Sequence, residues 1–271
     1  MSIQVYRVSS WNELQDHLFE DSWNPDIGRF RSRFAFRGLS DADFRLETTL
    51  IRLGGGYLGL EKHLLRNFRK YAHRNVVRGN SIWHWLSVAQ HYGLPTRLMD
   101  WTYSPFVAMH FSTANIERFD LDGVIWAVNY VKTHEILPDK LKEKLEDEGA
   151  NVFTVDMLSE SVESMKELDH ISDENIVIFF EPPSIDDRIV NQFAFFSMMS
   201  HPNAVMDDWL AAHPDFGKKI VIPAKLKWEI RDKLDQANVT ERVLFPGLDG
   251  LSSWLKRHYS PRNELDNGSR L

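Results

Sequence analysis

Residues 89–102, AQHYGLPTRLMDWT, gather into one short stretch side chains that could do chemistry. His91 is a potential acid or base, and Asp100 is a carboxylate that can accept a hydroxyl proton. Arg97 can clamp a carboxylate or phosphate through two hydrogen bonds, and Trp101 offers a plane for stacking. Together these residue types favour one wall of an anion-binding pocket. The residues support equally well a buried Arg97–Asp100 pair that only holds the turn under the next helix.

The common catalytic motifs are absent. No H-E-x-x-H, G-x-S-x-G or P-loop sequence occurs, so zinc proteases, serine hydrolases and P-loop NTPases have no sequence support. GGGYLG at 54–59 matches a dinucleotide fingerprint but lacks the preceding buried strand and the later acid, and we interpret it as a flexible loop. His84 or His91 with Asp100 could bind a metal, but histidines on a polar helical face are more often solvated. We therefore predict no metal site.

Composition and charge limit the class of protein. The chain has 271 residues, 43% of them hydrophobic, which is enough for a sizeable core. It has no cysteine, which excludes disulfides and thiolate chemistry. No apolar stretch approaches the roughly 20 residues that span a bilayer, and no export signal is recognisable. We expect a cytoplasmic protein without a membrane partner.

Charge is distributed unevenly along the chain. The net charge is −7, which argues against generic nucleic-acid binding by the whole surface. Residues 62–99 nevertheless carry seven Lys or Arg, four His and no carboxylate, whereas residues 134–174 carry 13 acids against four Lys. The basic segment could attract an anion, although the solvent-exposed face of a helix explains most of its basic residues.

The elements that must position these groups follow from periodicity and capping signals. A strand at 3–8 precedes a helix capped by Ser10, and a strand at 33–39 ends with Arg37 on the face opposite Phe36. Residues 57–76 predict a helix. The next helix, at 81–92, directs His84, Ser87 and His91 away from its apolar stripe, and Gly93 ends it. Ser104 and Pro105 begin a helix that continues to about residue 114.

The second half of the chain alternates strands and helices. Strands at 123–130 and 175–180 flank the acidic helical region. Residues 186–198 predict a short helix, with acids in its first turn, that continues into an aromatic strand. A strand at 218–224 is followed by amphipathic helices at 226–239 and 248–259. We predict one α+β domain with a central sheet flanked by amphipathic helices: residues 1–29 pack on the core, 30–259 form the main domain, and 260–271 are a frayed polar tail.

Four segments resemble the FRG domain family, over about residues 30–259. They are FRG at 36–38, AQHYGLPTRLMDWTYSPFVAMHF at 89–111, RIVNQFAFFS at 188–197 and LFPGLDGLSSWLKRHY at 244–259. The family occurs in bacteria and their phages and has largely no assigned activity. The order of its polar residues is similar to the layout of ADP-ribosyltransferase-like folds, in which an early strand residue and a late acidic residue bracket NAD.

This resemblance implies roles for individual residues. Arg37 would bind a pyrophosphate or ribose, His91 or Trp101 would contact the nicotinamide side, and Gln192 would occupy the late acidic position. Gln192 departs from the pattern because a neutral amide stabilises a developing positive charge far less than a Glu does. Asp100 could supply the missing acid.

We therefore expect a pocket for a nucleotide-like anion, with NAD as the possible substrate for ADP-ribosyl transfer or cleavage and a protein or nucleic acid as the possible target. The expected catalytic residues are His91, Asp100 and Gln192; the expected binding residues are Arg37, Arg97 and Trp101. One alternative is a nuclease that uses His91 and Asp100 as acid and base and the basic segment 62–99 to hold phosphates. Another is a non-catalytic interaction module.

Overall fold

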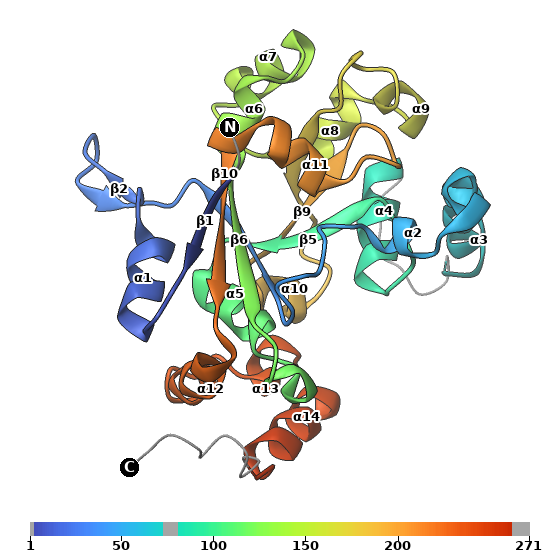
Figure 1. Cartoon of the computed structure of the whole chain (residues 1–271). Coiled ribbons are helices and arrows are strands. Elements are labelled where there is room, and N and C mark those ends of the chain that lie inside the picture. Colours follow the sequence, from blue (N-terminus) through green and yellow to red (C-terminus); the bar gives the residue numbers. More distant parts are fainter. Residues whose placement is uncertain (1–2, 73–80, 262–271) are drawn as a thin grey trace.

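A computed structural model describes residues 3–72 and 81–261, which are built around a mixed eight-stranded sheet (Figure 1). The strand order is β1-β10-β6-β4-β5-β9-β8-β7. In that order the strands are Gln4–Arg7, Gly217–Ile222, Gly123–Asn129, Phe34–Leu39, Leu98–Thr102, Ala194–Met199, Val177–Glu181 and Phe153–Thr154. The predicted α+β class with a central sheet is confirmed.

The two outermost strand pairs are parallel and all the inner pairs are antiparallel. Because β1 pairs with β10, the N-terminal residues supply an edge strand of the main sheet. Two short strands, β2 (Trp23–Asn24) and β3 (Arg29–Phe30), form a separate hairpin that projects from the body in Figure 1. No helix within the two described ranges is both long and apolar enough to cross a membrane.

The sheet forks between β4 and β5. These strands pair at one position, Phe36 with Thr102, whereas β4 pairs with β6 along its whole length and β5 with β9 along its own. Figure 1 shows β5 crossing at a wide angle to the steep strands β6 and β10. Most backbone N–H and C=O groups on the facing edges of β4 and β5 therefore do not hydrogen-bond to the other strand. Side chains must provide partners for these groups and occupy the space between the strands.

Helices α1 (Trp11–Phe19), α5 (Pro105–Ser112) and α12 (Lys227–Gln236) pack on the β4–β6–β10 half of the sheet through one apolar cluster. Close approach of α5 depends on Gly38, since a Cβ built there would lie 1.8 Å from the carbonyl oxygen of Ala108. Only glycine allows this contact. The FRG motif thus places Phe36 in the core, Gly38 against α5 and Arg37 beside the fork.

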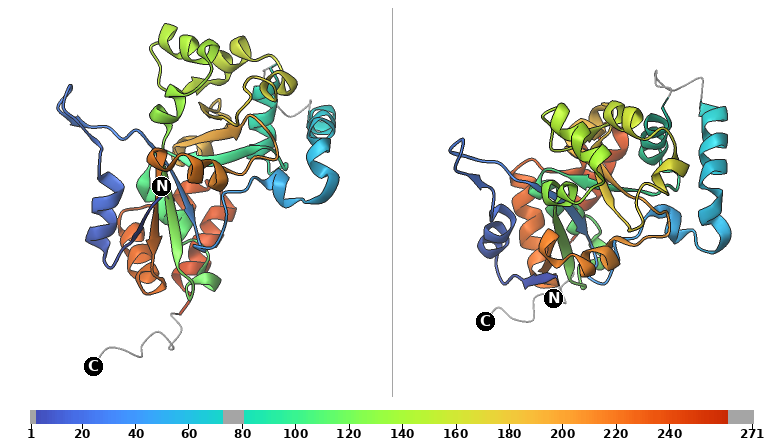
Figure 2. Two further views of the ribbon diagram at one scale, coloured as in Figure 1. Left: turned by 45° about the horizontal axis from the view of Figure 1, so that its top comes forward. Right: turned by 90° about the horizontal axis from the view of Figure 1, so that it is seen from above.

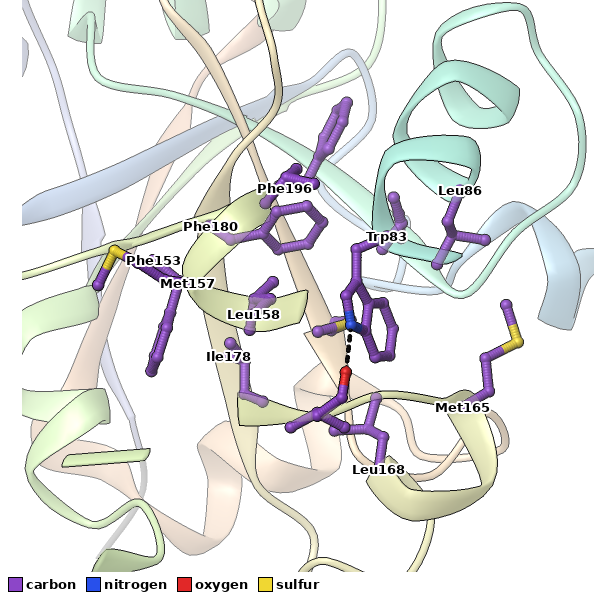
Figure 3. Close-up of a cluster of buried hydrophobic side chains, with 14 of the residues drawn as sticks. Trp83, Leu86, Phe153, Met157, Leu158, Met165, Leu168, Ile178, Phe180 and Phe196 are labelled. Atoms are coloured by element: carbon purple, nitrogen blue, oxygen red, sulfur yellow. Dashed lines mark hydrogen bonds between the residues drawn. The ribbon is translucent and has the colours of Figure 1, made fainter. Parts of the chain in front are cut away.

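A second apolar cluster joins the other half of the sheet to α4 (Ile82–His91), α8 (Val155–Ser161) and α9 (Met165–Leu168). Trp83 is fully buried at its centre and donates its indole N–H to the carbonyl oxygen of Val162 at 2.6 Å (Figure 3). This contact fixes α4, whose last residues reach the fork. The neighbouring α3 (Glu61–Ala72) lies at the periphery in the views of Figures 1 and 2.

The remaining helices complete the fold. The α-helices among them are α2 (Thr49–Arg52), α6 (Tyr130–Glu135), α7 (Asp139–Asp147), α10 (Asp187–Asn191), α11 (Met206–Ala212), α13 (Glu241–Leu244) and α14 (Leu248–His258). The 3₁₀ helices are η1 (Gly55–Leu60), η2 (Ile116–Arg118), η3 (Pro214–Phe216) and η4 (Ala224–Leu226).

The local start and stop signals are confirmed. Ser10 and Ser104 accept hydrogen bonds from the backbone N–H groups of Glu13 and Val107, and Gly93 follows α4 with φ +81°. Asp186 caps α10 through the N–H groups of Arg188 and Ile189.

Several predictions need correction. No strand was predicted at 98–102, yet these residues form β5, because β4 and β9 both pair with them. The GGGYLG loop is largely 3₁₀ helix η1. Ser87 is fully buried and donates to the carbonyl oxygen of Trp83, so it does not share a polar face with His91. The predicted helix at 57–76 is η1 followed by α3, and its last residues, like most of the predicted tail, lie outside the described residues.

Candidate functional site

Two adjoining cavities open at the fork in the sheet. The first, which we term the Arg37 cavity, has a volume of about 320 Å³, and the second, the His91 cavity, about 520 Å³. They share Asp100, Arg188, Gln192 and Ala194. A larger cavity of about 620 Å³ lies beside the β2–β3 hairpin, but it brings none of the predicted site residues together. The fork is therefore the candidate site.

Arg37 bridges the fork. Its Nη1 donates to the backbone carbonyl oxygen of Asp100 on β5. Strands β4 and β5 pair only at Phe36 and Thr102, so this side-chain hydrogen bond connects the two strands beyond their backbone pairing. Burial lowers the pKa of this guanidinium; the Asp100 carboxylate opposes the shift, and the positive charge of Arg52 adds to it. A nearby anion would relieve both the desolvation and the repulsion.

Three arginines line the Arg37 cavity, with Asp100 as its single acid. Arg52 closes α2 and donates to the carbonyl oxygen of Glu47 at 3.0 Å, and the guanidinium of Arg188 lies 5.1 Å from the centre of the Phe245 ring. Within the described residues, none of the three arginines forms an ion pair with a carboxylate. The cavity therefore has an excess of positive charge that a phosphate or carboxylate ligand could neutralise.

The Asp100 carboxylate is held in place by a chain of hydrogen bonds. Gln90 Nε2 donates to Asp100 Oδ2 at 2.8 Å, and Thr96 Oγ1 donates to Gln90 Oε1 at 2.5 Å. Asp100 itself is exposed, whereas Thr96 is fully buried. A rigid support thus presents an accessible carboxylate at the junction of the two cavities.

His91 pairs with Asp186. The distance from His91 Nε2 to Asp186 Oδ2 is 2.7 Å, and the imidazole is 7% exposed. Asp186 Oδ1 caps α10 at the same time, so its carboxylate cannot rotate freely. An imidazole held by a carboxylate in this way has a fixed ring orientation, as an acid–base residue requires.

Gln192 lines both cavities, but its amide nitrogen is engaged elsewhere. Nε2 donates to the carbonyl oxygen of Leu244 at 2.9 Å, and the Gln192 backbone carbonyl accepts from Thr102 Oγ1 at 2.7 Å. The residue is 8% exposed. It therefore joins the end of α10 to both α13 and β5.

Arg97 and Trp101 are both buried. Arg97 is 3% exposed, and its guanidinium pairs with Glu61 and Asp169, at 2.7 Å to each. The Arg97–Asp100 pair, which the sequence supported as the alternative to an anion-binding Arg97, is thus wrong, and Arg97 lines neither of the two cavities. Trp101 borders the Arg37 cavity, yet it is 2% exposed and its indole N–H donates to Ser197 Oγ.

Sequence reasoning missed Arg52, Arg188 and Asp186 as members of the site. Arg188 lies four residues before Gln192, in a segment already singled out, so helical spacing could have indicated it. Nothing local distinguishes Arg52 from other exposed arginines. Within the described ranges, no group of three or more His, Asp or Glu side chains is arranged to hold a metal ion.

The fold and the site define an α+β protein with a basic cavity at a fork in its sheet. Residues 32–121 match the family model of the FRG domain, which confirms that the chain carries an FRG domain. The match includes the motif at 36–38 and the block at 89–111, whereas the segments at 188–197 and 244–259 lie beyond it. No curated protein and no solved structure matches the chain.

Proposed function

We propose that the fork binds a nucleotide-like anion whose phosphates lie in the Arg37 cavity. The observation that carries this proposal is the set of guanidiniums of Arg37, Arg52 and Arg188 around one cavity, without an ion-paired carboxylate among the described residues. Guanidinium groups bind phosphate oxygens through pairs of parallel hydrogen bonds, and partly buried ones do so with little competition from water.

The walls of the cavity suit the rest of a nucleotide. Phe44, which is 40% exposed, and Phe111 add apolar surface beside the arginines. Binding sites for small ligands typically combine such surfaces with a few oriented polar groups. A base or ribose can therefore contact the aromatic rings while the phosphates contact the guanidiniums.

The adjoining cavities support a ligand with two halves, of which NAD is the candidate we favour. Asp100 lies at their junction, so a carboxylate is available where a ribosyl bond would break and positive charge would develop. In this proposal Asp100 stabilises that charge, Gln192 positions the ligand, and His91 serves as an acid or base. The reaction is ADP-ribosyl transfer or cleavage of NAD.

Titration calorimetry with ADP-ribose and mass spectrometry of nicotinamide release from NAD test binding and turnover separately. Arg37→Ala should weaken ADP-ribose binding by about 10-fold or more, the value of a charge-assisted hydrogen bond. Asp100→Asn should retain binding and lose nicotinamide release. The matched control is Arg29→Ala, an exposed arginine on β3 that lines neither cavity at the fork.

Each outcome has a distinct meaning. Absence of ADP-ribose, ADP and NAD binding by the wild-type protein would contradict the proposal as a whole. Binding of NAD without nicotinamide release, even when cell lysate supplies a target, would contradict the proposed reaction but not the proposed binding site. The acid–base role of His91 and Asp100 in the nuclease alternative stays a prediction, as does the non-catalytic module.

A further inference from the structure

The outer face of α3 carries a stripe of four basic side chains. Lys62, Arg66, Arg69 and Lys70 follow the spacing i, i+4, i+7 and i+8, which places them on one side of the helix. All four are exposed. We refer to these residues as the α3 basic stripe.

Among residues 3–72 and 81–261, no carboxylate compensates the charge of the basic stripe. Lys62 and Arg66, Arg66 and Lys70, and Arg66 and Arg69 are like charges at helical neighbour positions, which destabilises a helix. None of them forms an ion pair with another described residue. The single acid of α3, Glu61, is 4% exposed and is already bound to Arg97. The repulsion among these four charges is therefore not offset by a carboxylate among the described residues, and an external polyanion would relieve it.

The helix is a firm platform for such a ligand. Glu61 accepts from both the backbone N–H and the guanidinium of Arg97, and Leu65 is 2% exposed in the apolar cluster beneath. The guanidinium of Arg69 lies 5.4 Å from the centre of the Trp85 ring on α4. Because its apolar side is buried in the chain, α3 has no free apolar face to insert into a membrane.

An exposed aromatic ring accompanies the positive charge. Tyr71 is 75% exposed, with the Lys70 ammonium 5.2 Å from its ring centre. Cationic groups that track a backbone, together with aromatic rings on which bases stack, are the features by which proteins bind single-stranded nucleic acid. Binding of an acidic peptide would use the positive charge but would not require an exposed aromatic ring, so the ring favours a nucleic acid.

We propose that the α3 basic stripe binds the phosphodiester backbone of single-stranded nucleic acid, with Tyr71 available for stacking. None of these residues lines the cavities at the fork, so the proposal does not depend on the nucleotide site.

Fluorescence anisotropy with a labelled single-stranded oligonucleotide tests the proposal. The triple variant Lys62→Ala/Arg66→Ala/Lys70→Ala should bind at least about 10-fold more weakly at low salt. The slope of log affinity against log salt should fall by about 2, because roughly 0.7 counterion is released per neutralised phosphate on a single strand. Duplex of equal length should bind more weakly than the single strand, since its bases cannot stack on tyrosine.

The matched control removes the same charge elsewhere. Lys132→Ala/Lys225→Ala/Lys256→Ala takes three exposed lysines from other faces and should leave oligonucleotide affinity within about twofold of wild type. Equal losses in both triple variants, affinity that ignores salt, or equally tight binding of poly-glutamate would each overturn the proposal. ADP-ribose binding serves as the second readout: it should be unchanged in the α3 variant and weakened in Arg37→Ala, so that failure of one surface is distinguishable from failure of the other.

Discussion

Arg37 and Arg97 carry the same guanidinium group in opposite environments. Arg97 lies between Glu61 and Asp169 and is 3% exposed, so its charge is already neutralised inside the fold. Arg37 meets the backbone carbonyl oxygen of Asp100 and lines a cavity with two further arginines. Arg97, which is paired with two carboxylates, therefore stabilises the fold, whereas Arg37, which has only a neutral carbonyl partner, is available to a ligand.

Replacing Arg97 should affect stability and not ligand binding. Arg97→Ala leaves the Glu61 carboxylate buried without a counter-charge, and breaking a buried pair in this way costs roughly 3–5 kcal/mol. Urea unfolding followed by circular dichroism measures the loss. The double variant Arg97→Leu/Glu61→Leu should recover part of it, because no buried charge remains. A loss below about 1 kcal/mol would show that water replaces the guanidinium.

Arg188 should behave in the reverse manner. It is exposed and contacts the Phe245 ring, so Arg188→Ala should change the free energy of unfolding by less than about 1 kcal/mol. ADP-ribose binding should weaken by about 10-fold, and Arg188→Lys should restore it only in part, because an ammonium cannot make parallel hydrogen bonds. Unchanged affinity in the alanine variant would remove Arg188 from the site.

At the scale of elements, the contact between β4 and α5 positions one wall of the fork. Gly38→Ala introduces a Cβ 1.8 Å from the carbonyl oxygen of Ala108, so the helix or the strand must shift. Overpacking of this kind costs roughly 1–3 kcal/mol, and movement of β4 should also displace Arg37 and weaken ADP-ribose binding. Calorimetric melting and ligand titration measure the two effects. Gly56→Ala, where no atom lies within 4 Å of the new Cβ, is the control and should melt like wild type.

At the scale of the whole molecule, two buried histidines link stability to pH. Burial lowers the pKa of His134 to about 4, and burial together with the charge of Arg231 lowers that of His110 to about 3. The backbone N–H of Phe179 donates to His134 Nε2, so this nitrogen is an acceptor in the folded protein. Protonation would remove that acceptor, and the folded state therefore resists it.

Stability should accordingly fall in mild acid. Above a pH of about 6.5 both histidines are neutral in the folded and unfolded states; below it the unfolded chain takes up protons that the folded protein does not. Each histidine should then lower the free energy of unfolding by about 2 kcal/mol between pH 6.5 and pH 5. Urea unfolding at these two values measures the loss, and His134→Leu should reduce the pH dependence by about half. A free energy of unfolding that stays constant over this range would contradict the assignment.

The sequence itself determined the features that depend on near neighbours. Serine caps at 10 and 104, the left-handed Gly93, the alternation in β4 and the apolar runs of β6 and β10 involve residues within a few positions of one another, and the predicted elements were confirmed. The motif at 36–38 and the block at 89–111 identified the FRG domain in the same way. Residue types also predicted an anion-binding wall near Asp100, and this stays a prediction.

The tertiary structure alone decided which of these groups meet. Strand β5 exists because β9 pairs along it, although its own five residues include an exposed aspartate. Arg97 pairs with Glu61, 36 residues earlier, and not with Asp100, while His91 finds Asp186, 95 residues later. Ion pairs and cavities depend on distances in space, and a burial-driven fold brings together residues whose separation along the chain carries no signal of their contact.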